Sequence, residues 1–181
     1  EILNYINSIS ETTVTEYSDY WRTITPVNDQ EYFNRWRFAF LSVHTTWKTN
    51  VRAYEHIDKQ EQPTEKQQLQ QQIVYTRVGL INMRTEGMWR FQTDYWADPQ
   101  KWRKRDDETW DAFRDRTMNM CHGLGYAKTA FAIELCYPND CEITCLDTHM
   151  LQLYEYDTKK GSPSATKYKE MERHWVESCK T

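Results

Sequence analysis

Apolar and aromatic residues recur at helical spacing along almost the whole chain, and few glycines or prolines interrupt them. The 181 residues include only 5 Gly and 5 Pro, and the alternating β-branched runs that are typical of strands are rare. The periodicity predicts helices that begin after Ser10, near Gln30, at Trp47 and after Pro63. We therefore expect an all-α protein.

The second half of the chain continues the helical pattern. A helix is expected over residues 78–96, where Asp98-Pro99 stops it. Acidic residues at 106–108 are expected to cap and charge the start of a helix that runs to Cys121. Further helices are predicted over 126–137, 146–156 and 164–178, the last with Ser164 as its cap. No internal repeat or long linker divides the chain, so we expect a single domain over residues 1–181.

Composition restricts the class of protein. Hydrophobic residues make up 39% of the chain, and 8 Trp, 12 Tyr and 6 Phe provide enough apolar area for a core. Charged residues make up 28%, and no apolar run approaches the length that spans a bilayer, so we expect a soluble cytoplasmic protein that does not enter membranes. The five cysteines form no CxxC pair and have no zinc spacing, which predicts reduced thiols and no bound metal. The net charge of -4 argues against non-specific coating of DNA, but it leaves room for a basic face.

Two glycines separated by a single residue, Gly123 and Gly125, stand where one predicted helix ends and the next begins. Glycines at this spacing allow a tight turn and the close approach of another chain. The free N–H groups at the start of the second helix would point outward and suit a phosphate group. An ordinary connection between two helices would explain the same pattern, so both interpretations stay open.

Asp147 lies at the expected start of another helix, with apolar residues before and after it. Aspartate is favoured at this position simply as an N-cap. An ionised carboxylate in a half-buried cleft could also stabilise a developing cation or orient a water molecule. The residues around Asp147 are compatible with either role.

The glycine turn and the Asp147 segment, in this order, resemble parts of the helix-hairpin-helix DNA glycosylases, the endonuclease III-like superfamily. The matching segments are 40–46, 78–84, 122–125, 131–135 and 146–150, within a resemblance that spans 32–175. It implies two helical lobes with an active cleft between them, and a hairpin and catalytic segment at about 106–156. A group of four cysteines near the C-terminus is missing, which predicts that the chain holds no iron–sulfur cluster.

The resemblance also implies roles for individual residues. Asp147 would be the essential carboxylate, and the hairpin turn would hold a phosphate of the damaged strand. His44 stands where the family often has a glutamine that fills the space left by a flipped base. The residues expected to contact DNA are Gly123, Leu124, Gly125, Tyr126, His44, Thr46 and Arg84.

Members of this family that also cleave the strand use a lysine two residues after the second hairpin glycine. Without a gap that position is Ala127, which predicts no Schiff-base chemistry and keeps the apolar positions of 131–135 matched. A one-residue insertion would instead make Lys128 the catalytic lysine. The basic run at 101–105 is either a solvated face or a DNA contact.

The expected function is hydrolysis of the N-glycosidic bond of a modified or mismatched base in DNA, without strand cleavage, by a monomer that needs no cofactor. One alternative on the same fold is a thymine-hypermodification enzyme of the pyrophosphorylase type, for which viral operons are the usual setting. The missing lysine, the missing cluster and the acidic balance would fit that alternative. Another alternative is a non-catalytic relative that binds DNA or a partner protein.

Overall fold

The chain folds into helices throughout the part that the structure describes, which is residues 1–180 of a computed structural model. These residues contain no β-strand, so the all-α prediction is confirmed. No helix among them is both long and apolar enough to cross a bilayer. Residues 1–180 form ten α-helices and two short 3-10 helices, in this order: α1 Ile2–Ser8, α2 Glu11–Thr23, α3 Asp29–Leu41, α4 Trp47–Asp58, α5 Lys66–Thr76, α6 Ile81–Ala97, η1 Pro99–Trp102, α7 Trp110–Met120, α8 Tyr126–Cys136, α9 Thr148–Leu153, η2 Thr158–Lys160 and α10 Ala165–Cys179.

Several helices begin where the sequence predicts, because a polar side chain caps each start. Ser10, Thr46 and Ser164 each accept a hydrogen bond from the backbone N–H three residues later. These bonds depend only on neighbouring residues, which explains why the sequence pattern locates them. The first helix, α1, lies in a segment for which no helix is predicted.

The helix expected over 78–96 begins only at Ile81, so this predicted boundary is wrong. Arg77, Gly79 and Leu80 adopt left-handed backbone conformations, with φ values of 59°, 71° and 47°. Left-handed residues cannot continue a right-handed helix, so they end α5 and separate it from α6.

Helices α7 and α9 also begin later than predicted. Helix α7 begins at Trp110, not at the acidic run 106–108, because Thr109 caps it. The helix expected over 146–156 is limited to α9, since Asp147 caps its start and Glu155 turns the chain with a φ of 53° after its end.

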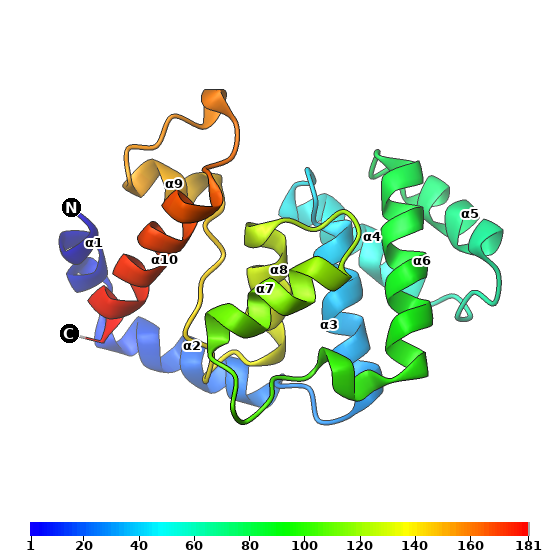
Figure 1. Cartoon of the computed structure of the whole chain (residues 1–181), viewed down its shortest axis with the longest axis horizontal. Helices are drawn as coiled ribbons and strands as arrows, with labels where there is room; N and C mark the ends of the chain where they lie inside the picture. Colours follow the sequence, from blue (N-terminus) through cyan, green and yellow to red (C-terminus); the bar gives the residue numbers. More distant parts are fainter. Residues whose placement is uncertain (181) are drawn as a thin grey trace.

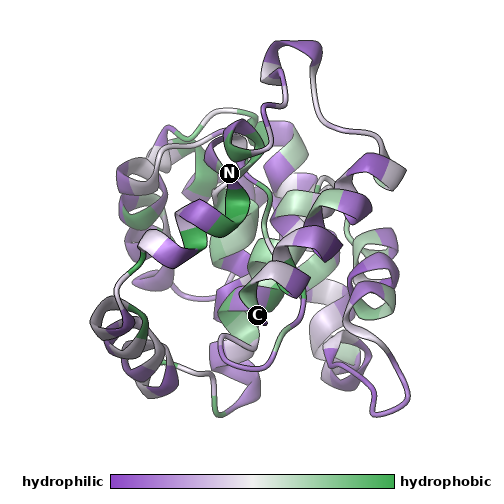
Figure 2. Cartoon of the chain, turned by 90° about the vertical axis from the view of Figure 1, so that its left-hand side faces the viewer, coloured by the Kyte–Doolittle hydropathy of each residue, from purple (hydrophilic) through white to green (hydrophobic). Residues whose placement is uncertain are grey.

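The α7–α8 hairpin lies between two groups of helices (Figure 1). Helices α3 to α6 form one group, and α8 packs along α3 to join the hairpin to it. Helices α1, α9 and α10 lie on the other side, where α1 contacts α10 and the two ends of the chain lie close together. Figure 2 views this second side and shows hydrophilic residues spread over its outer helices.

Two hydrophobic clusters correspond to this arrangement. The larger is rich in aromatic residues, and Trp102 packs there against Trp36 and Phe91 with ring centroids 5.2 and 4.7 Å apart. The smaller consists of Leu146, Leu151, Tyr168 and Met171. Leu124, from the glycine turn, belongs to the larger cluster, whereas Leu146, next to Asp147, belongs to the smaller one. The two segments with candidate chemistry therefore come from different clusters.

Candidate active site

A cavity of about 620 Å³ lies where the glycine turn and the Asp147 segment meet. The turn after α3, the start of α6, the start of α8 and the residues around 162–163 complete its walls. Six of the residues singled out from the sequence line it: His44, Gly123, Gly125, Tyr126, Lys128 and Asp147. Segments about a hundred residues apart in the chain thus contribute to one cavity.

The Asp147 side chain caps α9 through one oxygen and leaves the other unused. Its Oδ1 accepts the backbone N–H groups of His149 and Met150, at 2.9 and 3.0 Å. Within residues 1–180, its Oδ2 has no hydrogen-bond partner. Asp147 is exposed, in contrast to the half-buried position that its proposed chemical role predicts. Because the cap uses only Oδ1, a chemical role for Oδ2 is compatible with it.

The glycine turn leaves the start of α8 open. Gly123 has a φ of 89°, a conformation that side chains rarely adopt, and Gly125 precedes α8 without any side-chain cap. A Cβ atom on Gly125 would meet no atom within 4 Å. The first N–H groups of α8 are thus approachable by an anion. Leu124 is 6% exposed and anchors the turn in the core, so its side chain is not placed for contact with DNA.

Both lysine alignments lead to the same cavity, because Ala127 and Lys128 each line it. The Lys128 ammonium lies 5.3 Å from the centroid of the Phe131 ring. Burial and the Glu134 carboxylate raise the pKa of the Cys145 thiol, whereas Lys128 lowers it, which indicates that this lysine is close to the segment before Asp147. Lys128 therefore shares the cavity with Asp147.

Arg84 lies inside the protein, whereas the family resemblance implies that it contacts DNA. Its side chain is 1% exposed. Its guanidinium donates to the backbone carbonyls of Phe40, Leu41, Val43, Val78 and Gly79 and to Thr45 Oγ1. The bonds to Phe40 and Leu41 satisfy carbonyls at the C-terminal end of α3 that have no partner within the helix. Arg84 therefore has a structural role, since it joins the end of α3 and the turn that follows to the loop between α5 and α6.

The same arginine positions His44. The hydrogen bonds from Arg84 to Val43 and Thr45 hold the residues on either side of His44, whose φ is 48°. A left-handed conformation is unfavourable for histidine and persists only where the surroundings impose it. Arg84 thus stabilises the backbone conformation of this part of the cavity wall through hydrogen bonds from the protein interior.

Two other predicted groups lie elsewhere. Thr46 caps α4 and is not among the residues that line the cavity. In the basic run 101–105, Arg103 pairs with Asp29 at 2.6 Å and covers the Tyr32 ring. This run follows α6, whose opposite end is at the cavity, and the helix rises about 1.5 Å per residue over its 17 residues. The run is therefore far from the cavity.

The overall arrangement matches two solved structures. The crystal structure of the 8-oxoguanine DNA glycosylase of Thermotoga maritima aligns with a TM-score of 0.76, covering 98% of this chain and 86% of that chain, at 14% sequence identity. The chain has the fold of the 8-oxoguanine DNA glycosylases. The enzyme of Methanocaldococcus jannaschii aligns with a TM-score of 0.75 over the same shares, at 16% identity. No protein-family model matches the chain, and no curated protein matches it in sequence.

Within this glycosylase fold, Gly87 is a residue that the sequence interpretation missed. It lies in the middle of α6, where a Cβ atom would overlap the backbone carbonyl oxygen of His122 at the start of the glycine turn. Only glycine lets α6 and the turn approach this closely. In the sequence, the only indication of this close contact is that Gly87 is an isolated glycine inside a helical pattern.

The cysteines of this glycosylase fold are all free thiols. Burial raises the pKa of Cys121 and Cys136 well above the ordinary value, which keeps both thiols protonated and unreactive. Among residues 1–180, no group of three or more His, Cys, Asp or Glu side chains is arranged to hold a metal ion.

Proposed function

We propose that the chain is a DNA N-glycosylase that uses Asp147 as its essential carboxylate. The observation that carries this proposal is the Oδ2 atom of Asp147, which has no partner within residues 1–180 and belongs to a residue that lines a cavity shared with the glycine turn. The fold shared with two DNA glycosylases supports it. In this proposal the open N–H groups at the start of α8 bind a DNA phosphate, and the flipped base enters the cavity.

In the proposed reaction, Asp147 supplies the carboxylate that assists hydrolysis of the N-glycosidic bond. As the N-glycosidic bond breaks, its electron pair leaves with the base, and positive charge develops on the sugar. Asp147 Oδ2 stabilises this charge while the N–H groups of His149 and Met150 hold Oδ1 and fix the carboxylate. A water molecule then bonds to the sugar carbon, and the proton that it loses passes to Asp147 or to solvent, while the departing base takes up a proton from solvent. The products are the free base and an abasic site.

Monofunctional hydrolysis is the form that we propose first, because Ala127 occupies the ungapped position of the family lysine. The substrate class that we propose is a modified base, with 8-oxoguanine as the first candidate because the two similar structures are 8-oxoguanine DNA glycosylases. His44 would then help to hold the DNA strand from which the base has been extruded.

A base-release assay tests this proposal directly. Duplexes containing 8-oxoguanine, uracil, 5-hydroxymethyluracil, thymine glycol or a mismatch are incubated with the protein, and half of each sample is treated with hot alkali. We expect breaks only after alkali and none with Asp147→Asn, which keeps the cap but removes the charge. Full activity of Asp147→Asn on every cleaved duplex would rule out the proposed mechanism.

A second candidate is a glycosylase that also cleaves the strand through Lys128. The observation in its favour is that Lys128 lines the same cavity as Asp147. Its amine nitrogen, after losing a proton, would bond to the sugar carbon as the base leaves with the electron pair of the N-glycosidic bond. The C–O bond of the sugar ring at that carbon would then break, with a proton passing from the nitrogen to the ring oxygen, and the resulting imine is one that borohydride reduces to a stable protein–DNA adduct. Breaks without alkali, together with an adduct that Lys128→Gln abolishes, would establish this candidate in place of the monofunctional one.

A further inference from the structure

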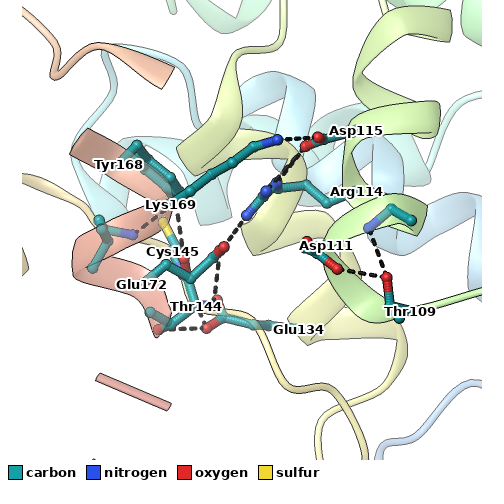
Figure 3. Close-up of polar contacts among 12 residues, drawn as sticks. Thr109, Asp111, Arg114, Asp115, Glu134, Thr144, Cys145, Tyr168, Lys169 and Glu172 are labelled. Carbon is teal, nitrogen blue, oxygen red and sulfur yellow. Dashed lines mark hydrogen bonds and ion pairs between the residues drawn. The ribbon is translucent and has the colours of Figure 1, made fainter. Parts of the chain in front are cut away.

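The segment immediately before Asp147 has no regular secondary structure, yet side chains hold its backbone. Residues 141–147 form neither helix nor strand. From α8, the Oε1 atom of Glu134 accepts hydrogen bonds from Thr144 Oγ1 at 3.0 Å and from the Cys145 backbone N–H at 3.1 Å. Figure 3 shows Glu134 beside Thr144 and Cys145 in this contact. A carboxylate thus takes the place of the neighbouring strand that an extended segment usually needs.

Helix α10 holds the same segment from another side. Glu172 accepts the Thr144 backbone N–H at 3.3 Å. The Tyr168 hydroxyl donates to the Thr144 carbonyl at 2.8 Å and accepts the Leu146 N–H at 3.1 Å. All of these partners lie at least ten residues away in the chain, so the tertiary fold places the segment.

The hairpin is connected to this network through both of its helices. Glu134 belongs to α8, and Glu172 pairs with Arg114 of α7 in an ion pair whose side chains are 5% and 0% exposed (Figure 3). Arg114 also bonds to Asp115, which pairs in turn with Lys169 of α10. The hairpin that carries the glycine turn is therefore tied to the residues that precede Asp147.

The last link to Asp147 is a backbone hydrogen bond. The Asp147 N–H donates to the Cys145 carbonyl at 2.8 Å. Glu134 binds the N–H of Cys145, and Cys145 binds the N–H of Asp147, so a shift of Cys145 moves Asp147 directly. Loss of an outer group that orients a reactive side chain in this way commonly lowers activity by about 10- to 100-fold.

We propose that Glu134 is a positioning residue that fixes Cys145 and thereby sets the place of the Asp147 carboxylate relative to the glycine turn. This inference rests on the proposed function for its effect on base release. Its structural content, which is the placement of Asp147 by Glu134, stands without it. The part that Glu134 plays is to accept hydrogen bonds, and a neutral side chain with the same oxygen would also do so.

Three variants separate the acceptor from the charge. Glu134→Gln keeps an oxygen at the same distance, Glu134→Leu removes it, and Glu134→Asp keeps the charge but withdraws it by one methylene. We expect Glu134→Leu to slow single-turnover base release by about 10 to 100-fold, with DNA affinity within about 3-fold of the wild type, because a small misplacement affects the reaction more than binding. Glu134→Gln is expected to restore the rate to within about 3-fold of the wild type.

Amide hydrogen exchange measures the placement without any substrate. We expect the N–H groups of Cys145, His149 and Met150 to exchange about 10-fold faster in Glu134→Leu than in the wild type, and to be unchanged in Glu134→Gln. Amides in α3 serve as the control for global stability. If Glu134→Leu does not fold, Glu134→Asp is expected to give the same local increase to a smaller degree.

The outcomes distinguish this inference from the proposed function. Unchanged exchange at Cys145 and His149 in a folded variant that lacks the acceptor would overturn it, and so would an increase that is equally large in α3. If the wild type releases no base from any duplex, the proposed function fails, while the exchange data still decide whether Glu134 places Asp147.

Discussion

Gly87 of α6 lies against the backbone carbonyl of His122, so closely that a Cβ atom on Gly87 would overlap the carbonyl oxygen. The same Cβ atom would come within 3.1 Å of the Phe40 ring. Both neighbours are part of the packed interior or of the backbone, so neither can move away at little cost. The missing side chain of Gly87 is therefore what allows the glycine turn to lie on α6.

We expect Gly87→Ala to destabilise the protein by about 1–3 kcal/mol, because the added methyl group must push α6 away from the turn. The gain in helix propensity from alanine, about 1 kcal/mol, offsets only part of this. Urea unfolding of both proteins measures the difference. The matched control is Gly125→Ala, where φ is -97° and the space is open, so a change within about 0.5 kcal/mol is expected. Equal losses in the two variants would contradict the overlap at Gly87.

The two oxygens of Asp147 predict that stability and activity respond differently to substitution. Asparagine caps helices as well as aspartate does, so Asp147→Asn is expected to change the free energy of unfolding by less than about 0.5 kcal/mol. Asp147→Ala removes the acceptor for His149 and Met150 and is expected to cost about 1 kcal/mol. Both variants should lose base release by at least about 100-fold, since both lose the negative charge. Thermal unfolding and single-turnover assays on the same samples check this, and an active Asp147→Asn would show that the charge is not needed.

Arg84 is expected to determine stability and not affinity for DNA. Lysine cannot reproduce a planar group that donates to six acceptors, so Arg84→Lys should destabilise the protein by about 2–4 kcal/mol. The salt dependence of DNA binding, measured where both proteins are folded, should be unchanged, because a buried arginine neutralises no phosphate. Arg90, an exposed residue on the same helix that pairs with Glu86, provides the control, and Arg90→Lys should cost less than about 0.5 kcal/mol. A weaker salt dependence in Arg84→Lys would show that this residue does reach DNA.

The raised pKa of Glu134 predicts that this residue contributes less to stability as the pH rises. Burial raises the pKa of Glu134 to about 7 in the folded protein, above the ordinary value of 4.5 for a glutamate side chain. Between these values the folded state binds a proton that the unfolded state has lost, so this group stabilises the protein below pH ~4.5, and its contribution falls as pH rises through about 7. Glu134→Gln cannot titrate. As the pH rises from 4.5 to 8, the free energy of unfolding of Glu134→Gln should therefore increase relative to that of the wild type, by up to about 3 kcal/mol. Urea unfolding at several pH values measures the difference between the two proteins, and a difference that is constant across this range would contradict the raised pKa.

Features that depend only on neighbouring residues follow from the amino-acid sequence alone. Ser164 and Thr46 cap helices through bonds that span three positions, and the glycine turn at Gly123 follows from the conformations that glycine alone allows. The position of Asp147 at the start of a helix is local in the same sense, and the segment around it resembles a known motif. Local rules of this kind hold wherever the rest of the chain lies.

The residues that support the cavity from outside it are evident only once the helices are packed together. In the sequence, Arg84 has the pattern of an exposed basic residue on a helix. Its acceptors at the end of α3 and in the following turn lie 39 to 44 positions away, and no local pattern indicates them. The overlap at Gly87 involves a carbonyl on another element, and the contacts of Glu134 depend on how α8 lies against the segment before Asp147. Burial and long-range hydrogen bonds are properties of the packed chain, because they depend on which distant groups share the interior. The sequence therefore indicates the candidate residues, and the packing of the helices determines how those residues are held in place.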